Sequence, residues 1–402
     1  MTQLSRFSLS PPNETKSLIH LSMIPGIGIQ TIRALLQVFS SAQKALEATS
    51  QELAEVDGLG PQLSRKLTEG RAKVPIDREI ELIRTHNCRV ITIHDEAYPS
   101  LLKQIEGGPL LLYTKGELPP ENALGIAVVG SRSPTEYGKT ISSQLSQQLA
   151  TRGVTIVSGL ARGIDTCAHR GALEAGGRTV AVLGNGLASV YPAENSSLVD
   201  EIVKEGALIS EFPMTMRPAP VNFPRRNRVM SGLTAGTVVV EASDQSGALI
   251  TARYAAEQGR EVFAVPGQIF SKLSKGTHRL INQGAHLVNT IDDILDAIPH
   301  HYQDSTSQSA PSNRPEERQF SPDRKVTDDT GPTNAPKPAP TPQLQLSTDE
   351  QMVLDAVAVP HSHIDEIART TQLPINKVSG ILVMLELKGA VQQLPGKQFA
   401  KK

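Results

Sequence analysis

The chain has 402 residues, in which 40 Lys and Arg stand against 41 Asp and Glu, with two cysteines and only 3% aromatic residues. This length exceeds that of one ordinary domain, and the balanced charge excludes a globally basic surface, so any polyanion site must be local. The two cysteines, Cys88 and Cys167, are far apart and support neither a disulfide framework nor a zinc site. No apolar run approaches the ~20 residues that cross a bilayer, and we expect a soluble, cytoplasmic protein without a membrane span.

Residues 1–75 contain an internal near-repeat. The segments "LSMIPGIGIQTIRALLQVF" and "LAEVDGLGPQLSRKL" each place Gly-x-Gly before a helical apolar pattern. Such glycines suit a tight hairpin whose backbone amides open onto a helix N-terminus, where an anion is favourable. The repeat resembles a tandem helix-hairpin-helix or SAM-like helical domain. Because few cations lie near the hairpins, both phosphate contact and a scaffolding role stay open.

Residues 76–299 are predicted to form one core domain, in which short β-branched runs alternate with segments of helical character from residue 124 to about 298. The runs are "GIAVVG", "VTIVSG", "TVAVLG", "ALISE", "TVVVEA", "EVFAVPG" and "AHLVNT". This alternation predicts an α/β core, a Rossmann-like, doubly wound and mainly parallel sheet with helices on both faces. Ligands of such sheets bind outside the carboxyl ends of the strands, so the residues that follow each strand are the candidate site.

The turn after the first parallel strand contains Gly130, Ser131 and Arg132. Ser133 is predicted to cap the next helix, and Pro134 to be its first residue. A cation held beside a positive helix terminus favours an anion, and phosphate is the economical partner. Since neither Gly-x-Gly-x-x-Gly nor a Walker-type motif is present, we expect no bound NAD or ATP and no other cofactor.

The turn after the second parallel strand repeats this chemistry. It contributes Ser158, Gly159, Arg162 and Gly163. Asp165, which follows, is interpreted as a local hydrogen-bonding residue, because no partner acid or histidine lies at a catalytic spacing. His169 is interpreted as a packed histidine. The next strand ends at Gly184, and Tyr191 beyond it either stacks on a base or packs against Pro192.

A basic cluster precedes the strand "TVVVEA". Its members are Phe223, Arg225, Arg226, Asn227 and Arg228. On a helix that begins near Pro224, Arg225 and Arg228 share a face through their i, i+3 spacing, whereas Arg226 points elsewhere. We therefore expect two of the three arginines to reach one ligand, and an ion-pair cluster with Glu211 or Glu241 is the alternative.

The C-terminal part divides into a linker and a small domain. Residues 300–345 are rich in Pro, Ser, Thr and charge, and predict a disordered linker. Residues 346–402 predict a winged helix of three helices and a hairpin that turns at Pro395-Gly396. Its predicted recognition helix offers few exposed side chains for contact with DNA bases: Asn376, Lys377 and Ser379. An auxiliary DNA-binding role and a partner-binding role both stay open.

Taken in order, the motifs resemble those of the DNA-processing protein A (DprA/Smf) family over about residues 85–298. They include "VVGSRSPTEYG", "SGLARGIDTCAHRGAL", "VLGNGLASVYPAEN", "LISEFP", "NFPRRNRVMSGLTAGTVVVEA" and "GTHRLINQGAHLV". The resemblance implies a non-enzymatic role: binding and protecting single-stranded DNA in natural transformation, and loading the recombinase RecA. It places Arg132, the Ser158–Gly163 turn and Arg226–Arg228 in the DNA pocket. We therefore expect Arg226 and Arg228 to be the DNA-contacting pair, and Glu241 to orient an arginine.

The same resemblance implies a homodimer whose interface involves the neighbourhood of His278, Ile281 and Leu287. Two other functions stay open. The segment "SGLTAGTVVVEA" is similar to a signature of Rossmann-like nucleotide phosphoribohydrolases, with Glu241 at the catalytic position, although the leading glycine pair is replaced by Thr234-Ala235. A scaffold that senses a mononucleotide is the other alternative.

Overall fold

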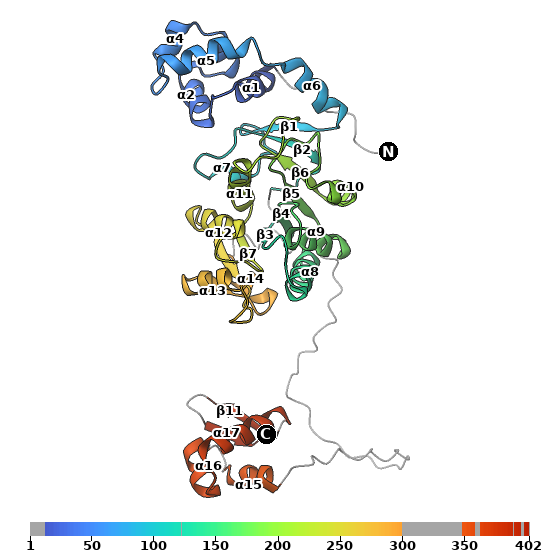
Figure 1. Cartoon of the computed structure of the whole chain (residues 1–402), viewed down its shortest axis with the longest axis vertical. Coiled ribbons are helices and arrows are strands. Elements are labelled where there is room, and N and C mark those ends of the chain that lie inside the picture. Colours follow the sequence, from blue (N-terminus) through green and yellow to red (C-terminus); the bar gives the residue numbers. More distant parts are fainter. Residues whose placement is uncertain are drawn as a thin grey trace, which may run out of the picture. The chain divides into compact units, whose positions relative to one another are not determined.

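The computed structural model describes residues 13–121, 123–299, 348–357, 362–388, 390–394 and 398–401. The chain divides into two compact units, Met1–Pro315 and Glu316–Lys402 (Figure 1). The predicted linker, residues 300–345, lies outside the described residues. No helix in the described part of the chain is long and apolar enough to cross a membrane.

The first unit begins with a group of short helices. They are α1 (Asn13–Met23), α2 (Ile29–Phe39), α3 (Ala42–Glu47), α4 (Ser50–Ala54), α5 (Pro61–Arg71) and α6 (Ile76–Thr85). The two predicted glycine hairpins are present: Gly26 and Gly58 have φ of +83° and +76°, a conformation that L side chains disfavour. Gly28 and Gly60 then cap α2 and α5. The helical domain predicted from the near-repeat is therefore confirmed.

A nine-stranded sheet follows in the same unit. Its strands are β1 (Arg89–Thr92), β2 (Leu111–Gly116), β3 (Gly125–Val129), β4 (Thr155–Ser158), β5 (Thr179–Val182), β6 (Ala207–Ser210), β7 (Gly236–Val239), β8 (Glu261–Ala264) and β9 (His286–Leu287). They lie in the order β1-β2-β6-β5-β4-β3-β7-β8-β9. Only the β1/β2 and β2/β6 pairs are antiparallel, which confirms the mainly parallel sheet. The antiparallel β1-β2 edge was not predicted.

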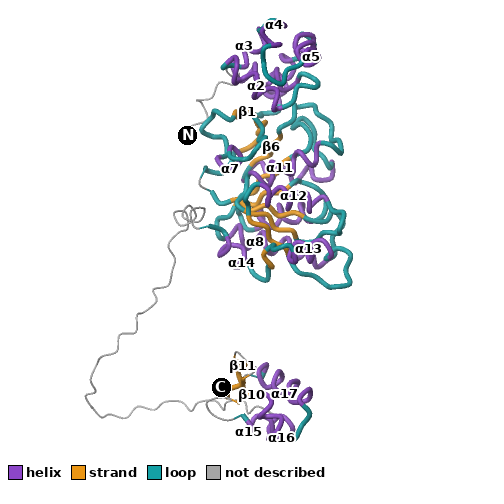
Figure 2. The backbone as a smooth tube through the Cα atoms, turned by 90° about the vertical axis from the view of Figure 1, so that its left-hand side faces the viewer, coloured by secondary structure: helices purple, strands orange, loops and turns teal. Residues whose placement is uncertain are grey.

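Helices cover both faces of this sheet. They are α7 (Ser100–Lys103), α8 (Glu136–Thr151), α9 (Ile164–Glu174), α10 (Ser196–Glu205), α11 (Asn222–Gly232), α12 (Gly247–Glu257), α13 (Lys275–Asn282) and α14 (Ile291–Ala297). Successive residues of β3 point to opposite faces, so Val128 packs in the cluster with α8 and α9, and Val129 in the cluster with α11 and α12. Figure 1 shows α8, α9 and α10 on one side and α7, α11 and α12 on the other, and Figure 2 shows the strands between the helical layers.

The helical domain is joined to the sheet by polar contacts. Arg33 of α2 donates from Nη2 to the carbonyl of Gly108 at 2.9 Å. The buried carboxylate of Glu79 on α6 accepts from the backbone N–H of Met214 at 2.7 Å, and burial raises the pKa of Glu79. Met214 lies in the loop that follows β6, so α6 holds a segment at the carboxyl edge of the sheet.

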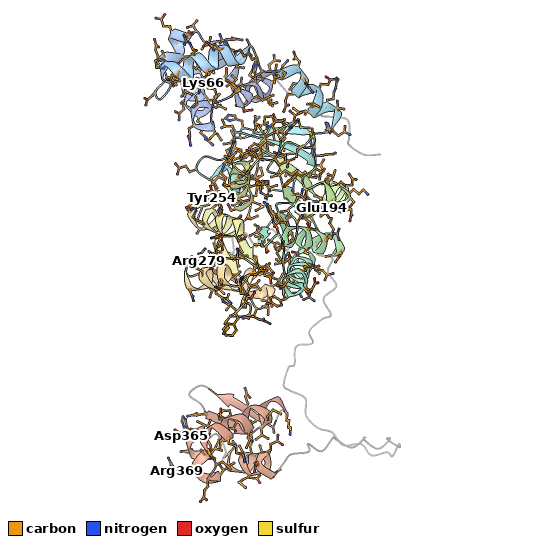
Figure 3. All side chains as sticks on the ribbon, viewed as in Figure 1. Lys66, Glu194, Tyr254, Arg279, Asp365 and Arg369 are labelled. Atoms are coloured by element: carbon orange, nitrogen blue, oxygen red, sulfur yellow. The ribbon has the colours of Figure 1, made fainter. Side chains whose placement is uncertain are left out.

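The second unit is a winged helix, as predicted. Its elements are α15 (Thr348–Ala356), β10 (Ser362–His363), α16 (Ile364–Thr371), α17 (Ile375–Leu387), β11 (Val391–Leu394) and β12 (Gln398–Lys401). The strands form an antiparallel sheet in the order β10-β12-β11. On α17, Lys377 pairs with Asp349 of α15 at 2.7 Å. Asp365 and Arg369 on α16 are exposed (Figure 3). The wing turn at Pro395-Gly396 lies outside the described residues.

Candidate nucleic-acid interface

The turn after β3 presents Arg132 at the carboxyl edge of the sheet. Arg132 is exposed, and its guanidinium lies 5.1 Å from the centre of the Phe223 ring. The helix α8 begins later than predicted: its cap is Thr135, whose hydroxyl accepts from the N–H of Gly138 at 3.2 Å. The prediction that Ser133 caps the helix is therefore wrong. The delayed start lengthens the turn that carries Arg132.

The cause of this late start is Glu241, which follows β7. Its carboxylate accepts from the backbone N–H of Thr135 at 2.9 Å and from the Thr135 hydroxyl at 2.5 Å. A side chain at Gly138 would collide with it, since a Cβ there would lie 2.4 Å from Glu241 Oε2. The prediction that Glu241 orients an arginine is wrong. Both carboxylate oxygens of Glu241 therefore accept hydrogen bonds from Thr135.

The turn after β4 is organised by Asp165. Its buried carboxylate accepts from the N–H groups of Gly159 and Ala161 at 3.1 and 3.3 Å, which confirms the predicted local role. Burial raises the pKa of Asp165, and the charge of Arg226 opposes that rise. Ser158 is buried and donates from its hydroxyl to the carbonyl of Val128 at 2.7 Å. The Ser158 hydroxyl therefore bonds to the neighbouring strand of the sheet and is not directed at a ligand.

The turns after β3 and β4 pack directly on each other. Gly163, the residue before α9, has φ of +76°. A Cβ at Gly163 would lie 2.4 Å from the carbonyl oxygen of Ser131. Only glycine permits this approach, which brings the backbone of the Arg132 turn against the N-terminus of α9.

Arg226 of α11 lines the pocket and is 5% exposed. Its Nη1 donates to the carbonyls of Gly159 and Val182, at 2.8 Å for the latter, and its Nε donates to the Asn227 side chain at 3.0 Å. Its guanidinium also lies 5.9 Å from the centre of the Phe223 ring. Burial lowers the pKa of Arg226, and the nearby Asp165 opposes that effect. This cation is fixed by two hydrogen bonds at the ends of β4 and β5 and by a third to its neighbour on α11.

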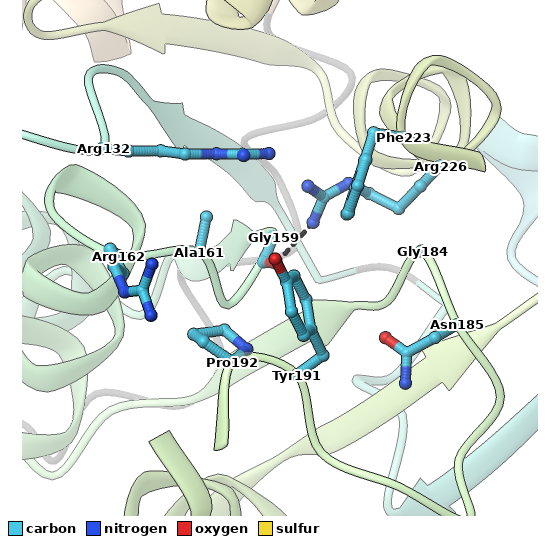
Figure 4. Close-up of a pocket in the computed structure, with 10 residues that line it drawn as sticks. All are labelled: Arg132, Gly159, Ala161, Arg162, Gly184, Asn185, Tyr191, Pro192, Phe223 and Arg226. Atoms are coloured by element: carbon cyan, nitrogen blue, oxygen red, sulfur yellow. Dashed lines mark hydrogen bonds between the residues drawn. The ribbon is translucent and has the colours of Figure 1, made fainter. Parts of the chain in front are cut away.

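A glycine turn and two aromatic side chains complete the pocket. Tyr191 is 43% exposed, its ring centre lies 6.2 Å from that of Phe223, and the Tyr191-Pro192 peptide is cis. A Cβ at Gly184 would lie 2.9 Å from the Phe223 ring, so the glycine lets this ring enter the site. Figure 4 shows the assembled pocket. It is lined by Arg132, Gly159, Ala161, Arg162, Gly184, Asn185, Tyr191, Pro192, Phe223 and Arg226.

Arg162 stands at the rim with its charge already paired. Its guanidinium donates twice to the carboxylate of Glu194, with Nη2 and Oε2 2.8 Å apart. Both side chains are more than half exposed. A phosphate at Arg162 therefore has to compete with Glu194, a residue that the sequence did not single out.

The three arginines of the basic cluster separate in space. Arg225 and Arg228 both pair with Oε2 of Glu211, at 3.2 and 2.6 Å, and Arg228 also donates to the carbonyl of Gly107. The Arg228 side chain is 15% exposed and does not line the pocket. The alternative prediction, an ion-pair cluster with Glu211, therefore holds for Arg225 and Arg228. The structure places only Arg226 in the pocket and does not bring Arg228 beside it.

The remaining predicted positions fall in two places. Asn227 is buried, and its side-chain oxygen accepts a hydrogen bond from Arg226. His278 of α13 contacts the carbonyl of Gly267 at 3.1 Å through Nε2, and Leu287 of β9 is 41% exposed. Ile281 is partly buried on α13. Near them the loop between β8 and α13 exposes Phe270, which the sequence pattern did not indicate.

The buried histidine of α9 is a packing residue, as interpreted from the sequence. His169 is inaccessible to solvent, and its Nδ1 lies 2.7 Å from the Thr179 hydroxyl. No group of three or more metal-ligating side chains is found among the described residues.

Gly159 controls the position of Arg226, and Gly159→Ala tests this. The new Cβ would lie 1.8 Å from Arg226 Nη1 and 2.4 Å from its Cζ, so the guanidinium must leave its carbonyl partners. We expect the free energy of unfolding, measured with urea and circular dichroism, to fall by about 1–3 kcal/mol or more. The control is Gly247→Ala, where no atom lies within 4 Å of the added Cβ. Equal stability of the two variants would contradict the described position of Arg226.

The fold and the pocket together define a Rossmann-like protein with cations and aromatic rings at the carboxyl edge of its sheet, flanked by helical-hairpin and winged-helix modules. The family described as DNA recombination-mediator protein A matches residues 89–299. The DprA winged helix domain matches residues 336–397, and the SAM-like helix-hairpin-helix tandem matches residues 18–73. The chain belongs to the DNA recombination-mediator protein A (DprA/Smf) family, and the resemblance seen in its motifs is confirmed.

Relatives extend this similarity over nearly the whole chain. Protein Smf of Synechocystis sp. is 34% identical over 95% of this chain and 97% of its own length. Protein Smf of Escherichia coli is 39% identical over 77% of this chain and 76% of its own. The X-ray structure of DNA processing protein A from Streptococcus pneumoniae superposes with a TM-score of 0.62 at 34% identity, covering 71% of this chain and 98% of that one.

Proposed function

We propose that the protein binds single-stranded DNA in this pocket, protects DNA that enters during natural transformation, and loads the recombinase RecA onto it. The observation that carries the proposal is the position of the Phe223 ring near two guanidinium groups, with Arg132 5.1 Å and Arg226 5.9 Å from its ring centre. Tyr191 adds a second, exposed aromatic ring beside it. Cations bind phosphate and aromatic faces stack on bases, which is the chemistry that single strands offer.

The two cations have different roles in this proposal. Arg132 is exposed and makes no side-chain hydrogen bond to any described residue, so its donors are available to a phosphate. Arg226 directs its donors to protein oxygens and contributes its positive charge near the Phe223 ring. Duplex DNA hides its base faces within the stack, whereas a single strand can present them to Phe223 and Tyr191. The pocket chemistry therefore favours single strands over duplexes.

The cellular part of the proposal rests on family membership. A recombination mediator acts on DNA together with a recombinase, and this supports RecA as the partner and the cytoplasm as the location. Exposed Leu287, with His278 and Ile281 beside it, supports a homodimer through α13 and β9. The engagement of Asp165 and Glu241 in hydrogen bonds within the fold supports a binding role and not a hydrolytic one.

Arg132→Ala tests the pocket assignment. We expect the affinity for oligo-dT to fall about tenfold, since hydrogen bonds to charged groups contribute roughly 1.5–3 kcal/mol. We also expect the slope of log K against log salt to become less steep by about 0.7 for each phosphate that the variant no longer neutralises. Filter binding or fluorescence anisotropy over a salt series measures both quantities.

The matched control is Arg170→Ala, which removes an exposed arginine from the middle of α9. Unchanged oligo-dT affinity in the Arg132 variant would refute the assignment. A thermal shift with a mononucleotide but none with the oligonucleotide would favour the sensing scaffold in its place.

A further inference from the structure

The loop that follows β6 exposes apolar and basic side chains directly beside the pocket. We call residues 213–221 the β6 loop. Met216 is 39% exposed and Val221 is 70% exposed, and Arg217 between them is also exposed. The Arg217 side chain makes no hydrogen bond or ion pair with any described residue. Large exposed apolar groups beside an unpaired cation are unusual on a surface that binds nothing.

Hydrogen bonds join the β6 loop to two neighbouring segments of the chain. Its Met214 and Met216 carbonyls accept from the N–H groups of Ala188 and Gly186, at 3.0 and 2.9 Å. The Gly186 segment is the turn that supplies Gly184 and Asn185 to the pocket. From the other side, Glu79 accepts from the Met214 N–H. The loop is therefore a continuation of the pocket wall with a fixed backbone.

The β6 side of the carboxyl edge carries a net positive charge. One carboxylate, Glu211, pairs with both Arg225 and Arg228, so this cluster keeps a net positive charge, and Arg217 adds another. A polyanion that leaves the pocket is therefore attracted over β6.

We propose that the DNA strand continues from the pocket across the β6 loop, where Arg217 contacts a phosphate and Met216 and Val221 contact sugars or bases. This proposal rests on the proposed function of the pocket and extends it to the nucleotides that flank the bound one. A flexible thioether adapts to different partners, so Met216 suits contacts that do not depend on base sequence. The loop therefore lengthens the binding site without adding sequence specificity.

The test compares Arg217→Ala with the unaltered full-length protein on two oligo-dT lengths. An oligonucleotide of about five nucleotides fills the pocket alone, and one of about fifteen also reaches the loop. We expect Arg217→Ala to bind the shorter one normally and the longer one about fivefold more weakly, with a salt slope less steep by about 0.7. The matched control is Lys204→Ala, which removes one charge from the last turn of α10, at the opposite edge of the sheet.

Each outcome separates this inference from the pocket assignment. If both lengths bind Arg217→Ala normally while Arg132→Ala weakens both, the strand does not cross the loop and the pocket assignment stands. If Arg217→Ala weakens both lengths equally, the loop acts on the pocket and the proposed path is wrong. If neither length binds the unaltered protein, the proposed function itself fails.

Discussion

Replacing Arg226 by leucine is expected to lower the free energy of unfolding by about 3 kcal/mol, because it removes one member of a buried, hydrogen-bonded charge network. The carbonyls of Gly159 and Val182 lose their donor, and the buried carboxylate of Asp165 loses the neighbouring positive charge. Urea unfolding of the full chain, followed by circular dichroism, measures this loss. The DNA affinity of the variant is measured at a temperature where it remains folded.

Two companion variants separate charge from shape. Arg226→Lys keeps the charge but not the planar fork, and we expect it to be intermediate in stability. Asp165→Asn in the Arg226→Leu background removes a buried carboxylate that has lost the larger of its two favourable charge interactions, that with Arg226, and part of the stability should return. If the double variant lost the full sum of the two single losses, the inferred coupling between Asp165 and Arg226 would be absent.

The second large effect concerns acid stability and His169. Burial lowers the pKa of His169 from 6.5 to about 3, and the charge of Arg226 acts in the same direction. Between these two pH values the unfolded chain binds a proton that the folded protein does not. The free energy of unfolding therefore falls as the pH decreases through this window, by up to about 1.4 kcal/mol per pH unit from this residue.

His169→Gln removes this titration while keeping a polar side chain near Thr179. We expect the variant to be less stable at neutral pH but to lose less stability than the unaltered protein between pH 6.5 and about 3. Urea midpoints collected across this range give the difference. The control is His94→Gln, which removes an exposed imidazole. Identical pH dependence in the His169 variant and the unaltered protein would show that the pKa of His169 does not differ between the folded and unfolded states.

The sequence predicted the sheet and its turns because their signals are local. Short β-branched runs define the parallel strands, and the glycines after β3 and β4 mark places where the backbone approaches a neighbour, as Gly163 does with Ser131. The helical hairpins at Gly26 and Gly58 are local in the same sense. Each of these features needs only neighbouring residues to be recognised.

The features that were missed or misassigned depend on contacts between distant segments. Glu241 binds Thr135 from 106 positions away along the chain, and this contact places the helix cap at Thr135 and not at Ser133. The separation of Arg226 from Arg228 depends on how α11 is rotated against the sheet and on Glu211 beneath it. Helical spacing showed that these side chains diverge, but it could not show which of them enters the pocket.

The pairing of Arg162 with Glu194 gives the pocket a built-in competitor. A small anion that binds Arg162 alone must displace the bidentate contact that Glu194 already makes with this arginine. In the proposed function, a polynucleotide is already held by Arg132 and the aromatic rings when its next phosphate reaches Arg162, so the exchange becomes intramolecular and is favoured by high effective concentration. We therefore expect the Glu194 carboxylate to select for ligand length, and to discriminate against free nucleotides and inorganic phosphate without any steric barrier.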